Sequence, residues 1–177
     1  LGDVYKRQQW GSKTPGHPEY GHTAGVDAST GPLGHGFAMG VGFAVAEAML
    51  AAKYNKPEFT VIDHYTYGLT SDGDLMEGVA SEAASLAGTL GLGKLIYLYD
   101  DNKITIEGST DIAFTEDVEA RFKAYGWQVL RVADSEDIEA MEAAVKEAQA
   151  DTEHPSLIIV RTHIGYGSPK QDSASCH

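Results

Sequence analysis

The spacing of apolar residues alternates along the chain between the period of a helix and the period of a strand. Helical spacing predicts four helices, at about 33–54, 75–90, 118–125 and 136–150, the last capped by Asp134 or Ser135. β-Branched and aromatic runs predict four strands, at 59–70, 95–102, 127–132 and 157–162. Strands that alternate with helices are joined by right-handed crossovers. We therefore expect an α/β fold, a parallel sheet with helices on both faces.

The first predicted helix carries a stripe of small residues one turn apart, which lets another element approach its backbone closely. These residues are Gly36, Gly40, Ala44 and Ala48. The apolar stretch 36–50 is shorter than the ~20 residues that a membrane span needs, so we interpret it as a buried helix. Glu47, within it, is expected on a solvated face.

Composition narrows the range of partners. Thirteen Lys and Arg against 26 Asp and Glu give the 177-residue chain a formal charge of -13, which repels nucleic acid and anionic membranes. We expect neither as a partner. A phosphorylated ligand would need a metal ion or local backbone amides to neutralise it. The single cysteine, Cys176, cannot form an internal disulfide, so a reducing, cytoplasmic compartment is expected.

Two polar side chains, Asp72 and Asn102, each follow a predicted strand. One crossover separates them, so both reach the edge of the sheet where parallel strands end and ligands bind. Mg²⁺ prefers oxygen ligands, and Asp72, Asn102 and a carbonyl near Ile104 would leave room for a diphosphate. Gly73 lets the backbone approach that ligand, and the following helix points free amides at it. The alternative is an ordinary turn, with Asp72 as a helix N-cap.

A competing phosphate motif fits poorly. Residues 88–95, GTLGLGKL, match part of a P-loop but lack its Ser or Thr, and they lie between a helix and a strand in the reverse order. The sequence contains no G-x-G-x-x-G. Both observations weaken a nucleotide-binding interpretation.

Four segments together resemble the first domain of the transketolases, a family of thiamine diphosphate enzymes. Two loops, GSKTPGHPE at 11–19 and TGPLGHG at 30–36, resemble the family's substrate loop and the loop beside the cofactor's pyrimidine end. The family signature, Gly-Asp-Gly followed by Asn about 30 residues later, resembles SDGDLMEG with YDDNKIT. IGYGSP at 164–169 leads to His177 at the family's spacing. We expect residues 9–177 to be a partial thiamine diphosphate-binding domain, and 1–8 to be a non-native or unmatched leader.

The resemblance implies how the diphosphate end of the cofactor is held. Asp72, Asn102 and the carbonyl of Ile104 would bind Mg²⁺, or Ca²⁺ or Mn²⁺ in its place. Asp72, Gly73, Asn102 and His177 would contact the diphosphate or its metal ion. His177 is also expected in the catalytic machinery.

The resemblance also assigns residues to the ring and substrate ends of the site. Ile164 would pack on the thiazolium ring, and His17 would reach into the substrate channel as a catalytic residue. Glu77 would join a proton relay at a dimer interface. The residues beside the aminopyrimidine ring would be Gly31, Pro32 and Leu33.

One position departs from the family pattern. The first Gly of Gly-Asp-Gly is Ser71 here. If this position needs a positive φ or close backbone approach, serine is unfavourable there. We then expect weakened rather than abolished cofactor binding.

The activity that the resemblance implies is transfer of a two-carbon ketol unit from a ketose phosphate to an aldose phosphate, in a homodimer. We expect this chain alone to be inactive, because in the family the Glu that activates the cofactor belongs to sequence beyond His177. Dihydroxyacetone synthase shares these motifs and is an alternative, as is the natural small subunit of a split transketolase. A nucleotide-binding Rossmann-like module is the least favoured alternative.

Overall fold

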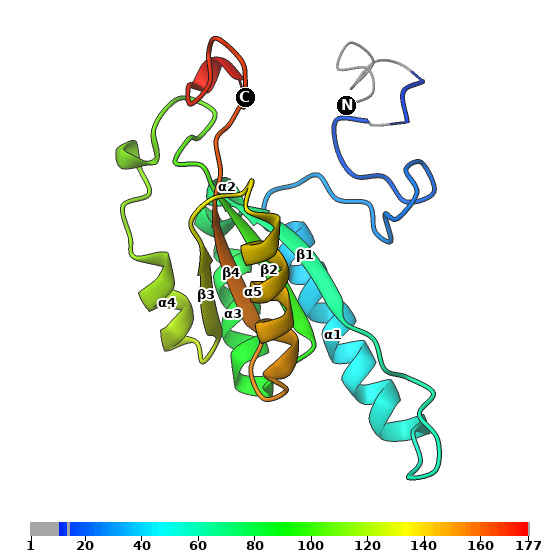
Figure 1. Cartoon of the computed structure of the whole chain (residues 1–177). Helices are drawn as coiled ribbons and strands as arrows, with labels where there is room; N and C mark the ends of the chain where they lie inside the picture. Colours follow the sequence, from blue (N-terminus) through cyan, green and yellow to red (C-terminus); the bar gives the residue numbers. More distant parts are fainter. Residues whose placement is uncertain (1–10, 14, 177) are drawn as a thin grey trace.

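The computed structural model describes residues 11–13 and 15–176, and its sheet has four parallel strands in the order β1-β2-β4-β3 (Figure 1). The strands are β1 Thr66–Ser71, β2 Leu95–Asp101, β3 Gln128–Val132 and β4 Ser156–Arg161. The α-helices are α1 His35–Tyr54, α2 Asp72–Met76, α3 Gly78–Leu90, α4 Val118–Ala124 and α5 Ile138–Ala150. Two short 3-10 helices lie at Thr110–Ile112 and Ala174–Cys176.

Helices cover both faces of the sheet, which confirms the predicted fold class. One face buries Tyr97 and Tyr99 of β2 in a cluster that also contains residues of α1, α3 and α4. The opposite face buries Ile96 against α5, which crosses the sheet in Figure 1. Because successive strand residues point to opposite faces, one strand supplies both clusters.

Helix α1 lies against β2 with almost no space between them. Gly40 faces the Tyr97 ring, and that ring stacks on Phe37 with centroids 4.2 Å apart. The Tyr97 hydroxyl donates to the carbonyl of Phe37 at 2.8 Å. The predicted close approach along the small-residue stripe is therefore confirmed at Gly40, whereas Ala48 is exposed.

Two expectations about α1 are wrong. The helix has 20 residues and is long and apolar enough to cross a membrane by length and composition alone, a test that core helices of globular domains also pass. Glu47 lies inside the fold, 5% exposed, because Lys94 reaches it at 2.7 Å and also pairs with Asp63. The expectation of a buried helix holds only for one stripe of α1, which contains Phe37, Gly40, Val41, Ala44 and Glu47.

Three element boundaries differ from prediction. The first strand is shorter than expected, beginning at Thr66. The predicted helix 75–90 begins earlier, at Asp72, and breaks at Glu77 into α2 and α3. Helix α5 is capped by Asp137 rather than by Asp134 or Ser135, two or three residues later than predicted, and the Asp137 carboxylate accepts from the Ala140 amide at 2.9 Å. Helix α3 ends at Leu90, as predicted, where Gly91 takes the left-handed conformation.

Alanine should change the free energy of unfolding in opposite directions at two glycines of α1, Gly40 and Gly42. A Cβ on Gly40 would lie 2.0 Å from the Tyr97 hydroxyl oxygen, whereas a Cβ on Gly42 meets nothing within 4 Å. We expect Gly40→Ala to lower the free energy of unfolding by about 2 kcal/mol through overpacking. Gly42→Ala should raise it by about 0.5–1 kcal/mol through helix propensity. Urea denaturation measures both, and equal effects would contradict this packing.

Candidate functional site

The carboxyl ends of β1 and β2 bring the two predicted metal ligands to one edge of the sheet. In the parallel register Ser71 lies opposite Asp100. Asp72 follows the first strand directly, and Asn102 follows the end of the second. In Figure 1, α2 and the loop after β4 lie at this same end of the sheet.

Asp72 is a buried carboxylate, 2% exposed, with one oxygen satisfied and the other not. The Tyr99 hydroxyl donates to Asp72 Oδ1, and Oδ2 has no hydrogen-bond partner among the described residues. Burial raises the pKa of Asp72, which the Tyr99 hydrogen bond opposes and the charge of Asp101 reinforces. A buried carboxylate oxygen without a partner is unfavourable, and a bound cation would relieve that cost.

Asn102 folds back over its own turn. Its Oδ1 accepts from the Ile104 amide at 2.8 Å. An amide oxygen has two lone pairs, so Asn102 can still bind a cation. Asp101 faces Lys103 Nζ at 2.7 Å and so already has a cationic partner.

The donor set also decides which kind of metal fits. Among residues 11–13 and 15–176, no three His, Cys, Asp or Glu side chains gather as metal ligands. Asp72, Asn102 and a backbone carbonyl are all oxygen donors with a single negative charge. That set suits a hard cation that takes its remaining ligands from a phosphate and water.

The turn that carries Asp72 is fixed by Asp74. Asp74 Oδ2 accepts from both the amide and the hydroxyl of Ser71 at 3.0 Å. Its Oδ1 accepts from the Gly34 amide at 2.8 Å. One carboxylate thus joins the end of β1 to the loop that precedes α1.

Ser71 adopts an ordinary backbone conformation. Its φ is -132° and its ψ is 175°, a region open to every residue. Serine therefore carries no penalty from a positive φ at this position, whereas the effect of a close approach of the backbone to the cofactor stays a prediction. Its hydroxyl adds a hydrogen bond to Asp74 that glycine cannot make.

The loop before α1 packs onto this turn. Leu33 lies against Gly73, since a Cβ built there would be 3.4 Å from a Leu33 methyl. Gly34 has a φ of 73°, and a Cβ on it would come within 2.8 Å of Glu77 Cβ. Only glycine fits here. We call residues 31–34, 71–74 and 102–104 the cradle.

His17 lies beside Gly31 and opens onto a cavity of about 870 Å³. Pro32, Leu33 and His64 line the same cavity. His17 is exposed, as a side chain that contacts a diffusing substrate must be. The structure thus brings His17 and the three predicted ring contacts together.

Glu77 lies outside both helices, at the junction of α2 and α3, and its side chain is exposed. Its backbone amide bonds to the Asp74 carbonyl at 3.2 Å. The carboxylate is accessible to a partner chain, and its part in a proton relay stays a prediction.

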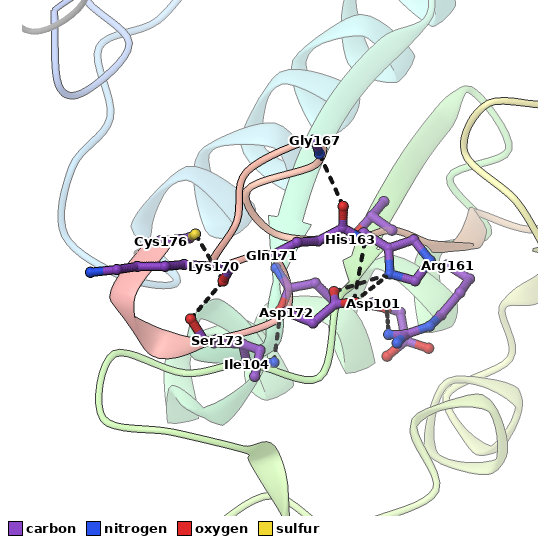
Figure 2. Close-up of polar contacts among 12 residues, drawn as sticks. Asp101, Ile104, Arg161, His163, Gly167, Lys170, Gln171, Asp172, Ser173 and Cys176 are labelled. Carbon is purple, nitrogen blue, oxygen red and sulfur yellow. Dashed lines mark hydrogen bonds and ion pairs between the residues drawn. The ribbon is translucent and has the colours of Figure 1, made fainter.

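The loop after β4 is held by its own polar contacts (Figure 2). The Ile164 carbonyl accepts from the Asp172 amide at 3.0 Å, and the Asp172 carboxylate lies 3.0 Å from His163 Nδ1. Cys176 packs against Gly165. The bond of Ile164 stays within this loop, so its approach to a thiazolium ring stays a prediction. His177 lies outside the described residues.

Sequence reasoning missed two residues of the site, Tyr99 and Asp74. Tyr99 looks like an ordinary core residue of an apolar strand, although a buried tyrosine hydroxyl usually has a partner. That rule could have pointed to Asp72 at the end of the adjacent strand. Asp74 lies three residues after Ser71, the spacing of a capping box, which is the signal that was available.

Removing the Ser71 hydroxyl should loosen the link between turn and loop. We expect Ser71→Gly to lower the free energy of unfolding by about 1 kcal/mol and to speed hydrogen exchange at the Gly34 amide. The affinity for thiamine diphosphate should not rise. Ser109→Gly is the matched control, because that hydroxyl likewise makes one short-range hydrogen bond, although there it accepts, from the Asp111 amide. A tighter cofactor complex in Ser71→Gly would contradict this account.

Comparison with known proteins agrees with this geometry. The family model for the thiamine diphosphate-binding domain of transketolase matches residues 1–177. Transketolase of Nostoc sp. is 60% identical over 177 residues, which cover 99% of this chain and 26% of that protein. The Streptococcus pyogenes serotype M6 transketolase is 58% identical over 175 residues, 99% of this chain and 24% of that protein.

Solved structures give the same result. Transketolase from Pichia stipitis in complex with sedoheptulose-7-phosphate has a TM-score of 0.92 at 54% identity, over 97% of this chain and 26% of that chain. The Leishmania mexicana transketolase has a TM-score of 0.91 at 49% identity, over the same shares. The chain spans about a quarter of the length of the curated relatives it matches. With its parallel sheet and the cradle at the strand ends, the chain belongs to the transketolase family, as its thiamine diphosphate-binding domain.

Proposed function

We propose that the protein containing this domain transfers a two-carbon ketol unit between sugar phosphates. The observation that carries the proposal is the buried Asp72 carboxylate, whose free oxygen lies at the strand ends of a thiamine diphosphate-binding domain. A relative from Pichia stipitis was solved in complex with a sugar phosphate, sedoheptulose-7-phosphate. The family match and Asp72 therefore support the cofactor end of the proposed site, and the relative's sugar phosphate complex supports its substrate end.

The cradle would hold Mg²⁺ together with the cofactor's diphosphate. Asp72, Asn102 and the Ile104 carbonyl supply the protein's oxygen ligands, and Ca²⁺ or Mn²⁺ could replace Mg²⁺. When bound, thiamine diphosphate supplies the electron sink that stabilises a carbanion. The protein's task is to fix the diphosphate and orient the rings. Leu33, packed on Gly73, extends the cradle from the diphosphate turn toward the pyrimidine end.

His17 would serve the substrate. It lies at the cavity beside Gly31 and is accessible. An imidazole can donate to or accept from a sugar hydroxyl and move protons near neutral pH. His177, adjacent in sequence to Cys176, is proposed to contact the diphosphate.

A second copy of the protein is the proposed partner. Helices α1 and α3 pack against each other, and each exposes large apolar side chains. Exposed apolar side chains on two helices that pack together favour an interface with another chain. The exposed residues include Phe43, Met49 and Leu50 of α1 and Val79, Leu86 and Leu90 of α3. A cytoplasmic location, and the absence of nucleic acid and membrane partners, are also proposed, on the strength of the acidic composition and the single cysteine.

Calorimetric titration tests the cation site. We expect thiamine diphosphate to bind only when Mg²⁺ is present, and Asp72→Ala to weaken binding at least about 100-fold, because the only charged ligand is lost. Asp63→Ala is the matched control, because Asp63 lies before the start of β1 and pairs with Lys94 rather than with the proposed cation. Mg²⁺-independent binding, or equal losses in both variants, would contradict the site.

The reaction itself is tested on the longest polypeptide that the gene encodes. A ketose phosphate and an aldose phosphate are supplied, and the new ketose and aldose phosphates are measured. Ketol transfer should appear there and be absent from the 177-residue chain alone. Formaldehyde as acceptor separates this activity from dihydroxyacetone synthase.

A further inference from the structure

Tyr99 and Asp72 form a buried pair at the centre of the proposed cation site. Both side chains are 2% exposed, and the tyrosine hydroxyl donates to Asp72 Oδ1. We propose that Tyr99 is a positioning residue, which holds Asp72 as a single-oxygen ligand and so favours Mg²⁺ over Ca²⁺. The inference rests on the proposed function and deepens it.

The position of the Tyr99 hydroxyl is set by the fold. Tyr99 lies on β2, a strand paired on both sides, by β1 and by β4. Its ring belongs to the cluster that contains Leu75 of α2 and Phe122 of α4. A ring packed in this way has few rotamers, so the hydroxyl is aimed at one place. A tyrosine hydroxyl carries a proton near neutral pH, so it donates to the Asp72 carboxylate, which can only accept when ionised.

The two oxygens of Asp72 are therefore unequal. Oδ1 accepts the Tyr99 hydrogen bond, whereas Oδ2 is buried without a hydrogen-bond partner among the described residues. Lys103, whose charge acts on Asp72, has its ammonium 2.7 Å from Asp101. The free oxygen is the one left for a bound cation.

Single-oxygen binding discriminates between cations. Mg²⁺ requires near-ideal octahedral geometry at 2.0–2.1 Å, which suits one oxygen per carboxylate. Ca²⁺ takes six to eight oxygens at longer distances and readily uses both oxygens of a carboxylate. A hydrogen bond that occupies Oδ1 withholds the second oxygen and so disfavours Ca²⁺.

The test removes only the hydroxyl. Mg²⁺ and Ca²⁺ are each titrated, at saturating thiamine diphosphate, into the longest polypeptide that the gene encodes, as wild type and as Tyr99→Phe. Loss of an outer hydrogen bond typically weakens metal binding 10–100-fold. We expect the Kd for Mg²⁺ to rise about 10-fold and that for Ca²⁺ to change less than about 3-fold.

Tyr97→Phe is the matched control. Tyr97 lies two residues earlier on the same face of β2, is 1% exposed, and donates to a backbone carbonyl of α1 rather than to Asp72. This variant should lose a similar amount of stability but keep the wild-type ratio of the two dissociation constants. Thermal unfolding of both variants checks that they fold.

The outcomes separate the two proposals. An unchanged ratio in Tyr99→Phe, or an equal change in Tyr97→Phe, would overturn the positioning role while the cation site stands. Failure of the wild-type protein to bind either cation would overturn the proposed site, and the positioning role with it.

Discussion

The structure of the site depends on one unfavourable burial, that of the Asp72 carboxylate. A charge removed from water needs partners for each of its oxygens, and among the described residues only Tyr99 donates a hydrogen bond to this carboxylate. The raised pKa of Asp72 expresses the same cost, since above that pKa the ionised form destabilises the folded chain. With a cation bound at the free oxygen, the ionised form of Asp72 would stabilise the folded chain instead of destabilising it. The requirement for a ligand is thus built into the end of β1.

Strand β2 aligns the two halves of the cradle. Tyr97 donates to the first turn of α1 and so fixes the helix that follows the loop at 31–34. Tyr99, on the same face of the strand, donates to Asp72. Asp74 then joins loop to turn through its bond to Gly34. The two tyrosines thus act on different parts of the cradle, Tyr97 through the helix after the loop at 31–34 and Tyr99 through Asp72.

The alternation of helices and strands, and the meeting of Asp72 and Asn102 at one edge, were predictable because period and parallel topology determine them. Boundaries were less predictable. At the break, Glu77 lies against Gly34, which is 43 residues away in sequence, and no local pattern records that contact. Glu47 was misplaced for the same reason, because its partner Lys94 is 47 residues away. Tyr99 was missed because a tyrosine in an apolar strand resembles an ordinary core residue, although a buried hydroxyl needs a partner.

Because the chain is acidic, the binding of a phosphorylated ligand depends on the groups at the site itself rather than on the overall charge. A formal charge of -13 opposes the approach of a diphosphate or a sugar phosphate. The same surface attracts divalent cations, and at the cradle a single buried carboxylate oxygen gives a cation a specific place to bind. Because the ligand's phosphate oxygens would complete the cation's shell, cation and diphosphate should each bind poorly without the other. On the proposed function, the overall charge would make a bound metal ion a condition for holding the cofactor, and the hydrogen bond from Tyr99 would leave Oδ2 of Asp72 to receive it.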